Sequence, residues 1–374
     1  LCIGELIQED GLYNLNTRRI DYLRKNKGKI KIDSTIAEAA TDQPMNIAMR
    51  ADYGTGHGGT ATVGSNAEVI NDTAGEITLK GTYAIGQLAR VSTVTNKGKI
   101  LTDTDIKNSI GMSTLGGKLT NEGTITLTGS GVSKNIGVFL NSYTLNGTTY
   151  NPTGVLGANS AITVSGDSST GILINGSAST ATPATATLDY GGNVTVTGNG
   201  VSGMTIGDNN NGNAEVTVKN DGKVTVNNGA NPSDVYQYTS GTNTIKQGSY
   251  GIVVSKNSKL VSDGTHNVEV DVNVKEPESI GLYAGENAIL EVGKHTVKAN
   301  EGAVNYDADK GTIRLKGVGD ATTGQKSLLF YLGDNGTGKV YIDGTMTAKI
   351  EGGANPNLRG TAFYYVGTGS SPFG

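Results

Sequence analysis

The stretch VEVDVNVK, residues 268 to 275, carries the acidic residues whose spacing could support catalysis. Side chains alternate along a strand, so Glu269, Asp271, Asn273 and Lys275 would share one face. Converging carboxylates serve as acid and base in glycoside and polysaccharide cleavage, which makes an enzyme one alternative. No Asp-Asp pair or flanking Arg reinforces this pattern, and a solvated strand face has the same one. We therefore predict no catalytic residue in this chain.

Three histidines are a second source of acid–base or metal chemistry. His57, His266 and His295 stand in GTGHGGT, DGTHNVEV and VGKHTVK, and none belongs to an HExxH motif. We interpret each as an exposed loop histidine. GDNNNGN, residues 207 to 213, has a single acidic residue and favours a turn over a calcium loop. We predict neither a metal site nor a cofactor.

Tyrosines in two segments are the best candidates for binding chemistry. Tyr143 and Tyr150 stand in SYTLNGTTYNP, and Tyr236 and Tyr238 stand in NPSDVYQYTSG. Phenol rings flanked by Asn, Asp and Gln combine contact area with hydrogen bonds, which suits a sugar or a protein surface. The alternative is that these rings fold back and pack against the body of the protein. We take these four tyrosines as candidate ligand-binding residues.

The composition favours many short strands joined by tight turns. Of the 374 residues, 56 are Gly, 7 are Pro and none is Trp, while Thr, Val and Ile are frequent. The net charge of -4 gives no electrostatic reason to expect nucleic acid. The single cysteine, Cys2, excludes an internal disulfide and a Cys-based zinc site. No apolar stretch is long enough to predict a membrane-spanning helix.

Two sequence signatures alternate along the chain. The first is a Gly corner followed by alternating Ile/Val and Thr/Lys, which predicts a strand with one apolar and one polar face. It recurs as NKGKIKI from Asn26, TAGEITL from Thr73, NKGKIL from Asn96, NEGTITL from Asn121, YGGNVTV from Tyr190, NDGKVTV from Asn220, DKGTIRL from Asp309 and TGKVYI from Thr337.

The second signature is a small apolar strand after a polar turn, as in YAIGQL, NSIGM, NIGVFL and ESIGLY. The spacing of its glycines runs from 25 residues (86 to 111) to 48 residues (203 to 251), a period typical of solenoids, propellers and arrays. The absence of Trp argues against a propeller, and the scarcity of Leu argues against leucine-rich repeats. The glycines are Gly86, Gly111, Gly137, Gly171, Gly203, Gly251 and Gly281.

These signatures predict an all-β fold, a parallel β-helix (β-solenoid), over residues 26–374, with about ten to thirteen rungs. Longer steps hold insertions that we expect at the corners, in residues 141–157, 177–190 and 227–248. Residues 1–25 do not follow the pattern and are expected to be an irregular or capping segment. The residues predicted to point inward and stack as ladders are Ile100, Ile125, Val194, Val224 and Ile313.

The segment NSIGMSTLGGKLTNEGTITLTG, residues 108 to 129, resembles passenger domains of bacterial autotransporter (type V secretion) adhesins, most of all the large fusobacterial outer-membrane adhesins. The resemblance runs from about Asn26 to Gly374 and rests on motifs of the fold rather than of catalysis. It implies a right-handed β-helix on the bacterial cell surface, anchored in the outer membrane by a barrel domain that this chain does not contain. A start at Leu1 without a leader fits a piece of a longer protein.

The resulting hypothesis is an adhesin segment that attaches to host cells or neighbouring bacteria through its corner loops. The expected partner is a glycan or protein receptor on a host or bacterial cell surface. We expect no nucleic acid, no membrane insertion by this segment, and a monomer. The alternatives are a β-helical carbohydrate-active enzyme, a lyase or glycosidase, and a pure structural spacer whose binding tip lies elsewhere.

Overall fold

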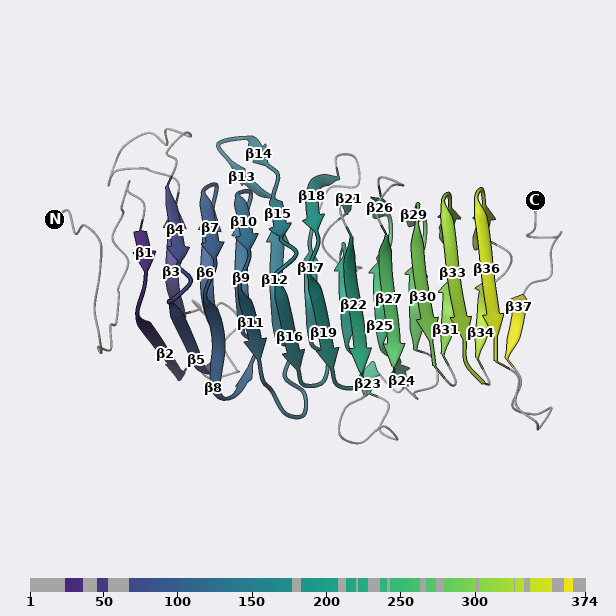
Figure 1. Cartoon of the computed structure of the whole chain (residues 1–374), viewed down its shortest axis with the longest axis horizontal. Helices are drawn as coiled ribbons and strands as arrows, with labels where there is room; N and C mark the ends of the chain where they lie inside the picture. The colour runs from purple at the N-terminus through teal and green to yellow at the C-terminus, as the bar shows by residue number, and fades with distance from the viewer. Residues whose placement is uncertain are drawn as a thin grey trace.

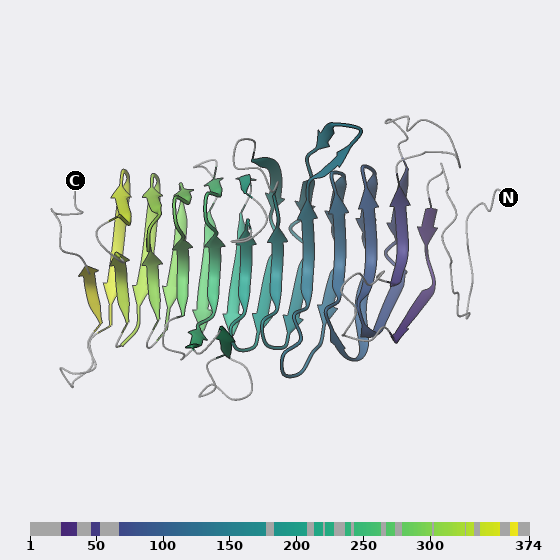
Figure 2. The same ribbon diagram turned by 180° about the vertical axis from the view of Figure 1, so that it is seen from behind.

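The chain forms an elongated stack of coils built from short strands. The computed structural model describes residues 24–35, 46–52, 67–176, 183–207, 213–219, 221–227, 236–240, 243–262, 267–273, 279–300, 303–325, 327–332, 337–351 and 360–365. These residues form strands, turns and bends, without a helix among them. Figure 1 shows the coils side by side along the long axis from the N-terminal to the C-terminal end, and Figure 2 shows the same order from behind.

Three parallel sheets of 11 strands each form the sides of this stack. Sheet A contains β1 (Arg24–Asn26), β4 (Glu68–Asn71), β7 (Thr93–Asn96), β10 (Lys118–Asn121), β15 (Thr153–Leu156), β18 (Ala184–Tyr190), β21 (Ala214–Lys219), β26 (Lys259–Ser262), β29 (Ile289–Val292), β32 (Thr312–Leu315) and β35 (Lys339–Ile342). Sheet B contains β2 (Lys29–Thr35), β5 (Glu76–Thr82), β8 (Lys99–Lys107), β11 (Thr124–Leu127), β16 (Ala161–Ser165), β19 (Asn193–Thr197), β22 (Gly222–Asn227), β27 (Val268–Asn273), β30 (His295–Ala299), β33 (Val318–Thr323) and β36 (Thr345–Ile350). Sheet C contains β3 (Asn46–Asp52), β6 (Ala84–Arg90), β9 (Ile110–Leu115), β12 (Ile136–Asn141), β17 (Thr170–Ile174), β20 (Ser202–Ile206), β25 (Tyr250–Val254), β28 (Ile280–Ala284), β31 (Val304–Asp307), β34 (Leu328–Leu332) and β37 (Thr361–Tyr365).

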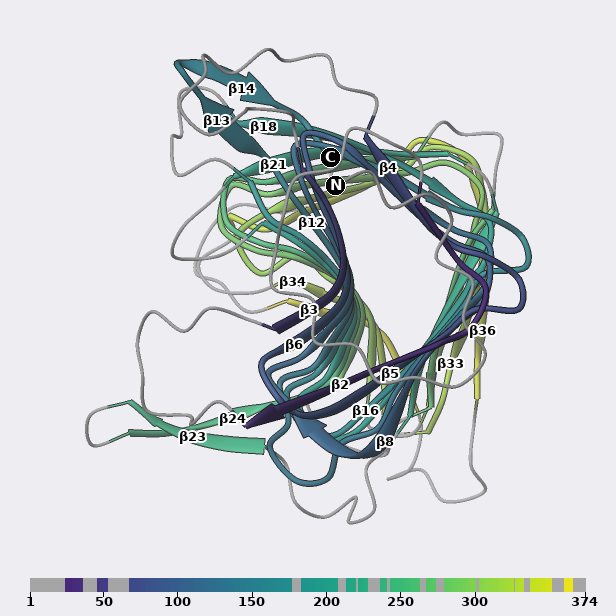
Figure 3. The same cartoon turned by 90° about the vertical axis from the view of Figure 1, so that its left-hand side faces the viewer.

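Each coil contributes one strand to sheet A, the next to sheet B and the third to sheet C. The prediction of a parallel β-solenoid is therefore confirmed, and 11 strands per sheet lie within the predicted number of rungs. Two antiparallel hairpins interrupt the repeat, β13–β14 (Tyr143–Leu145 and Thr148–Tyr150) and β23–β24 (Tyr236–Ser240 and Asn243–Gln247). Seen along the stack, they project from the two corners that flank sheet C (Figure 3).

The predicted inward residues do form the core. Ile100 pairs with Ile125, and Val194 with Val224, at matching positions of neighbouring strands in sheet B. All five predicted residues are at most 1% exposed, which confirms that they point inward. Ile313 also points inward, but it stacks with residues of sheet A rather than sheet B, because β32 belongs to sheet A. A single coil cannot bury its apolar face, so stacking supplies the core.

A ladder of amide side chains closes the corner between sheets A and B. The amide nitrogen Nδ2 of Asn26 donates to Oδ1 of Asn71, that of Asn71 to Asn96, and that of Asn96 to Asn121, at 2.8, 2.8 and 2.7 Å. The last amide donates to Oγ of Ser160 at 2.6 Å. Buried amides need such partners, so the Asn that precedes the Gly corner in these coils serves as a hydrogen-bonding side chain as well as a turn residue.

The structure corrects two details of the predicted repeat. Two of the predicted insertions contain rung strands: β15 lies within residues 141–157 and β18 within residues 177–190. The last two copies of the Gly-corner signature, DKGTIRL and TGKVYI, form β32 and β35 of sheet A, whereas the other six form strands of sheet B. The first described strand begins at Arg24, and residues 1–23 lie outside the described part of the chain.

Candidate functional site

The hairpin β13–β14 is the most complete candidate site among the described residues. Tyr143 and Tyr150 are cross-strand partners at its base. At its tip, Asn146 and Gly147 adopt φ angles of 50° and 79°, the left-handed pair that a two-residue hairpin turn requires and that Asn-Gly favours. This Asn-Gly signal was present in the sequence but was not used to predict the hairpin.

Both tyrosines of this hairpin lean against the preceding coil. A side chain at Gly116, whose φ is +65°, would place its Cβ 2.7 Å from Cβ of Tyr150 and 3.1 Å from Cβ of Tyr143. The guanidinium carbon of Arg90 lies 5.8 Å from the centre of the Tyr143 ring, within the range of a cation–π contact. Both rings are half-buried, while Asn146 and Gly147 are exposed. The two tyrosines thus partly support the hairpin against the preceding coil, and its exposed tip carries Thr, Asn and Gly.

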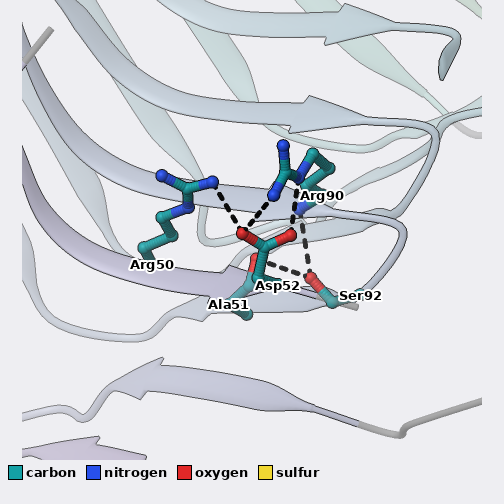
Figure 4. Close-up of polar contacts among 5 residues, drawn as sticks. All are labelled: Arg50, Ala51, Asp52, Arg90 and Ser92. Atoms are coloured by element: carbon teal, nitrogen blue, oxygen red, sulfur yellow. Dashed lines mark hydrogen bonds and ion pairs between the residues drawn. The ribbon is translucent and has the colours of Figure 1, made fainter. Parts of the chain in front are cut away.

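An ion-pair cluster on β3 and β6 holds Arg90 under the hairpin (Figure 4). Arg90 donates from Nε and Nη2 to the two carboxylate oxygens of Asp52, each at 2.6 Å, and Arg50 Nη2 donates to Oδ2 at 2.6 Å. Oγ of Ser92 accepts from the backbone N–H of Arg90 at 3.1 Å and donates to the carbonyl of Ala51 at 2.8 Å. The two-point geometry fixes the guanidinium plane as well as its position.

The three residues Arg50, Asp52 and Arg90 together carry a net positive charge, because two guanidinium groups share one carboxylate. The side chains of all three residues are 29% exposed, so solvent reaches them. Nε of Arg50 is buried, and no described residue forms a hydrogen bond with it. The cluster therefore offers a cationic, partly aromatic surface at the foot of an exposed hairpin, which suits contact with a partner rather than proton transfer.

The second pair of candidate tyrosines lies on the other hairpin. Tyr236 pairs with Gln247 and Tyr238 with Ile245 in the β23–β24 ladder. The orientation of their side chains lies outside the described part of the structure. β13–β14 follows the fourth strand of sheet C, and β23–β24 precedes the seventh. The fold thus places the four candidate tyrosines at two corners rather than in one site.

The acidic face of β27 is paired within sheet B. Nζ of Lys223 lies 2.9 Å from Oε1 of Glu269 and 3.8 Å from Oδ2 of Asp271. The hydrogen bond to Glu269 is the main cause that raises the pKa of Lys223. The inward residues Val270 and Val272 are fully buried, so the carboxylates lie on the outer face, as alternation predicted. Lys275 lies outside the described residues.

His295 contradicts the interpretation as an exposed loop residue, because it begins β30 and is 1% exposed. Its Nδ1 lies 2.9 Å from the carbonyl oxygen of Gly293, and its ring meets the edge of Tyr306. Room for the imidazole comes from Gly319 on the next coil, where a Cβ would lie 2.4 Å from the ring. Burial lowers the pKa of His295 and favours the neutral form. His57 and His266 lie outside the described residues.

The outer face of sheet C carries apolar side chains that sequence analysis did not single out. Strict alternation would place Ile110 and Met112 on one face, yet Met112 lies in the core and Ile110 in a separate outer cluster. The alternation shifts by one position at the intervening Gly111, which explains why a period-two reading missed this face. The cluster consists of Ile85, Leu88 and Ile110, with partly buried Ile47, Leu115, Ile136 and Phe139 packed against it.

Comparisons with known proteins do not identify this chain: no protein-family model matches it, and no curated protein matches it. The described residues contain no group of three or more His, Cys, Asp and Glu side chains arranged to hold a metal ion. Among the same residues, no helix has the length and apolar character needed to cross a membrane. The geometry of the fold and its hairpins is therefore the basis for the functional argument.

Proposed function

We propose that this chain is a surface-displayed adhesin segment, a β-helical rod that attaches to host cells or neighbouring bacteria through its corner hairpins. The observation that carries the proposal is the β13–β14 hairpin, which projects from a regular stack and rests on the Arg50–Asp52–Arg90 cluster. The partner in this proposal is a glycan or protein receptor on the opposing surface, bound by a monomeric rod.

The division between rungs and hairpins supports this assignment of roles. Rung residues are constrained by stacking on both neighbouring coils, so the outer face of sheet B repeats Thr, Lys and Asn with little distinctive shape. A hairpin at a corner escapes that constraint and can present a different surface. In this proposal, Tyr143 and Tyr150 position the exposed tip of one hairpin, and Tyr236 and Tyr238 contribute rings from the other.

The cellular setting comes from the resemblance to autotransporter passenger domains. We place the chain outside the cell, anchored in the outer membrane through a barrel domain of the longer protein. We also infer a right-handed coil, because connections between parallel strands of one sheet are right-handed in about 98% of cases. Neither inference depends on which receptor the hairpins contact.

A bead-attachment assay tests the proposal directly. Beads coated with the purified chain should bind host cells or bacteria, and Tyr236→Ala with Tyr238→Ala should weaken attachment by more than about 1 kcal/mol. The tip variant Asn146→Ala with Thr148→Ala should weaken it similarly, while circular dichroism stays rich in β structure. The control is Thr126→Ala, an exposed position on sheet B.

Two other outcomes would favour the rival functions. Wild-type beads that attach no more than uncoated beads would favour a structural spacer. New reducing ends after incubation with polysaccharides, abolished by Glu269→Gln with Asp271→Asn, would favour an enzyme. The ion pairs of both carboxylates with Lys223 support the structural role of this strand face instead.

A further inference from the structure

A carboxyl group lies between two phenol side chains on the outer face of sheet C, far along the rod from the β13–β14 hairpin. Tyr283 of β28 pairs with Asp307 of β31, and Asp307 pairs with Tyr331 of β34. Tyr306 and Phe330, the residues before Asp307 and Tyr331, point inward: their rings are stacked in the core with centres 5.0 Å apart. Alternation therefore directs Tyr283, Asp307 and Tyr331 outward.

Spacing places the two phenol side chains on opposite sides of the acid. Neighbouring strands lie about 4.8 Å apart, so Tyr283 and Tyr331 are separated by about 10 Å along the column. Asp307 therefore occupies the middle position of this column, with one phenol side chain on either side. Tyr250 of β25 contacts Tyr283 edge to face, with ring centres 5.6 Å apart, and extends the aromatic surface toward the N-terminal end.

One of the two carboxyl oxygens of Asp307 is buried without a hydrogen-bond partner among the described residues. Asp307 is 7% exposed, and no atom in the described part of the chain forms a hydrogen bond with its Oδ1. Burial is the main cause that raises the pKa of Asp307 to about 8; the charge of Asp309 acts in the same direction, and a backbone hydrogen bond from Asp309 acts in the opposite direction. An unpaired buried carboxylate is unfavourable, so this position is incomplete in the isolated chain.

Asp309 is the described group whose charge acts on the pKa of Asp307, and its charge is negative. The hydroxyl of Tyr283 lies 3.4 Å from Oδ2 of Asp309, and burial raises the pKa of Tyr283. Within the described residues, the titratable groups that neighbour Asp307 on β28, β34 and the end of its own strand are Tyr283, Tyr331 and Asp309. Two carboxyl groups and the faces of phenol rings form a surface that attracts a cation.

We propose that Tyr283, Asp307 and Tyr331 form a recognition site for an arginine side chain presented by a partner protein. A guanidinium group is flat, stacks on aromatic faces and donates two parallel hydrogen bonds to one carboxylate, which matches a carboxyl between two rings. A neutral sugar hydroxyl would satisfy Oδ1 but would leave the buried charge without a counterion. The site is separate from the hairpins and does not depend on the adhesive role.

Arginine binding at this site must be linked to proton release. Near pH 7 the carboxyl of Asp307 is largely protonated, because its pKa is about 8. The cation binds the ionised form, so affinity should rise with pH by roughly tenfold per unit up to about pH 8 and then level off. A sugar held by the neutral carboxyl would show no such rise.

Isothermal titration of the purified chain with the peptide Ac-Gly-Arg-Gly-amide at pH 6, 7, 8 and 9 tests the inference. The expected result is binding that strengthens about tenfold from pH 7 to pH 8 and releases close to one proton, read from buffers of different ionisation enthalpy. The matched control peptide replaces Arg with citrulline, which keeps the shape but has no charge, and should not bind measurably. Free arginine amide, titrated alongside, shows whether the peptide backbone adds affinity.

Variants locate the site on this column. Asp307→Asn should abolish binding and its pH dependence, and Tyr283→Leu should weaken it at least tenfold. Asp103→Asn, at an exposed acid on sheet B, should leave it unchanged. In the wild-type chain, the carboxyl carbon resonance of Asp307 should titrate near pH 8 alone and at lower pH with the peptide, a readout that needs no variant. Equal binding of the citrulline peptide, unchanged affinity in Asp307→Asn, or no binding at pH 9 would overturn the proposal.

Discussion

Gly111 of sheet C faces Ile125 of sheet B on the next coil, and a Cβ at Gly111 would lie 2.5 Å from Cγ2 of Ile125. The same relation joins Gly86 to Ile100 and Gly281 to Val297. In β31, Asn305 occupies the position that Gly281 has in β28. On the following coil, the residue of sheet B at the matching position is the smaller Ala321 in place of Val297. The rod therefore keeps a constant interior volume by opposing a small residue to a large one.

Replacing Gly111 by Ala should destabilise the protein by about 1 to 3 kcal/mol, because the added methyl overlaps Cγ2 of Ile125 and lies 2.6 Å from the carbonyl oxygen of Gly137. Urea denaturation followed by circular dichroism measures the effect. The control is Gly157→Ala, whose Cβ would have no neighbour closer than 3.7 Å, and whose effect should be near zero. Equal midpoints for the two variants would show that the contact does not restrict this position.

Truncating Ile125 to Ala should cost about 2 to 4 kcal/mol, since its side chain is fully buried and leaves a cavity. Thr126→Ala, on the exposed face of the same strand, should change the midpoint little. Combining Ile125→Ala with Gly111→Ala should cost less than the sum of the single changes, because the first removes the atom that the second would meet. If the two losses of unfolding free energy are simply additive, the side chains at positions 111 and 125 do not interact.

The Asn ladder gives a prediction about polar stacking. Asn96→Ala should destabilise the protein by about 1 to 3 kcal/mol, because it leaves the buried Oδ1 of Asn121 without the donor that lies 2.7 Å away. Asn193→Ala, at an exposed position of sheet B, is the matched control. Hydrogen exchange should show faster opening of β7 and β10 in the first variant. Unchanged exchange there would mean that the ladder adds no stability.

Stability should depend on pH through Asp307, whose folded pKa is raised to about 8. An acid with a raised folded pKa holds its proton more tightly in the folded state, so its contribution is complete below the unfolded pKa of about 3.9 and is lost as pH rises toward 8. Asp307→Asn should remove this decline and stabilise the chain by a few kcal/mol at pH 8.

Thermal unfolding of wild type and Asp307→Asn between pH 5 and pH 9 measures this effect. The lowered pKa of His295 acts in the opposite direction, since its contribution is present above the unfolded pKa of about 6.5 and is lost as pH falls. The difference between the two proteins isolates Asp307, because both contain His295. A constant difference across this range would contradict a raised pKa at Asp307.

Arg90 should anchor the β13–β14 hairpin. Arg90→Lys keeps the charge but loses the two-point contact with Asp52, and we expect a loss of roughly 1 kcal/mol with faster amide exchange at Tyr143 and Tyr150. Asp343→Asn, which removes an exposed ion pair with Arg314, is the control and should change stability by less. If amide exchange in the hairpin of Arg90→Lys equals that of wild type, the ion-pair cluster does not determine how well the hairpin is ordered.

The sequence by itself determined the parallel β-solenoid, the inward direction of Ile100 and Ile125, and the corners that follow Asn-x-Gly. These features follow from alternation and turn chemistry, which act over a few residues and repeat in each coil. The tertiary structure decided which sheet a strand joins, because that depends on how the corner lengths add up along the coil. For this reason Ile313 lies in sheet A, and His295 is buried against Gly319.

The candidate sites divide in the same way. The sequence places Tyr143 and Tyr150 on an insertion at a corner, because the spacing between the repeated glycines lengthens there. Their contact with Arg90, and the position of Asp307 between Tyr283 and Tyr331, join residues from different coils. Such neighbours are set by register between strands that lie far apart in the chain, so only the stacked structure brings them together.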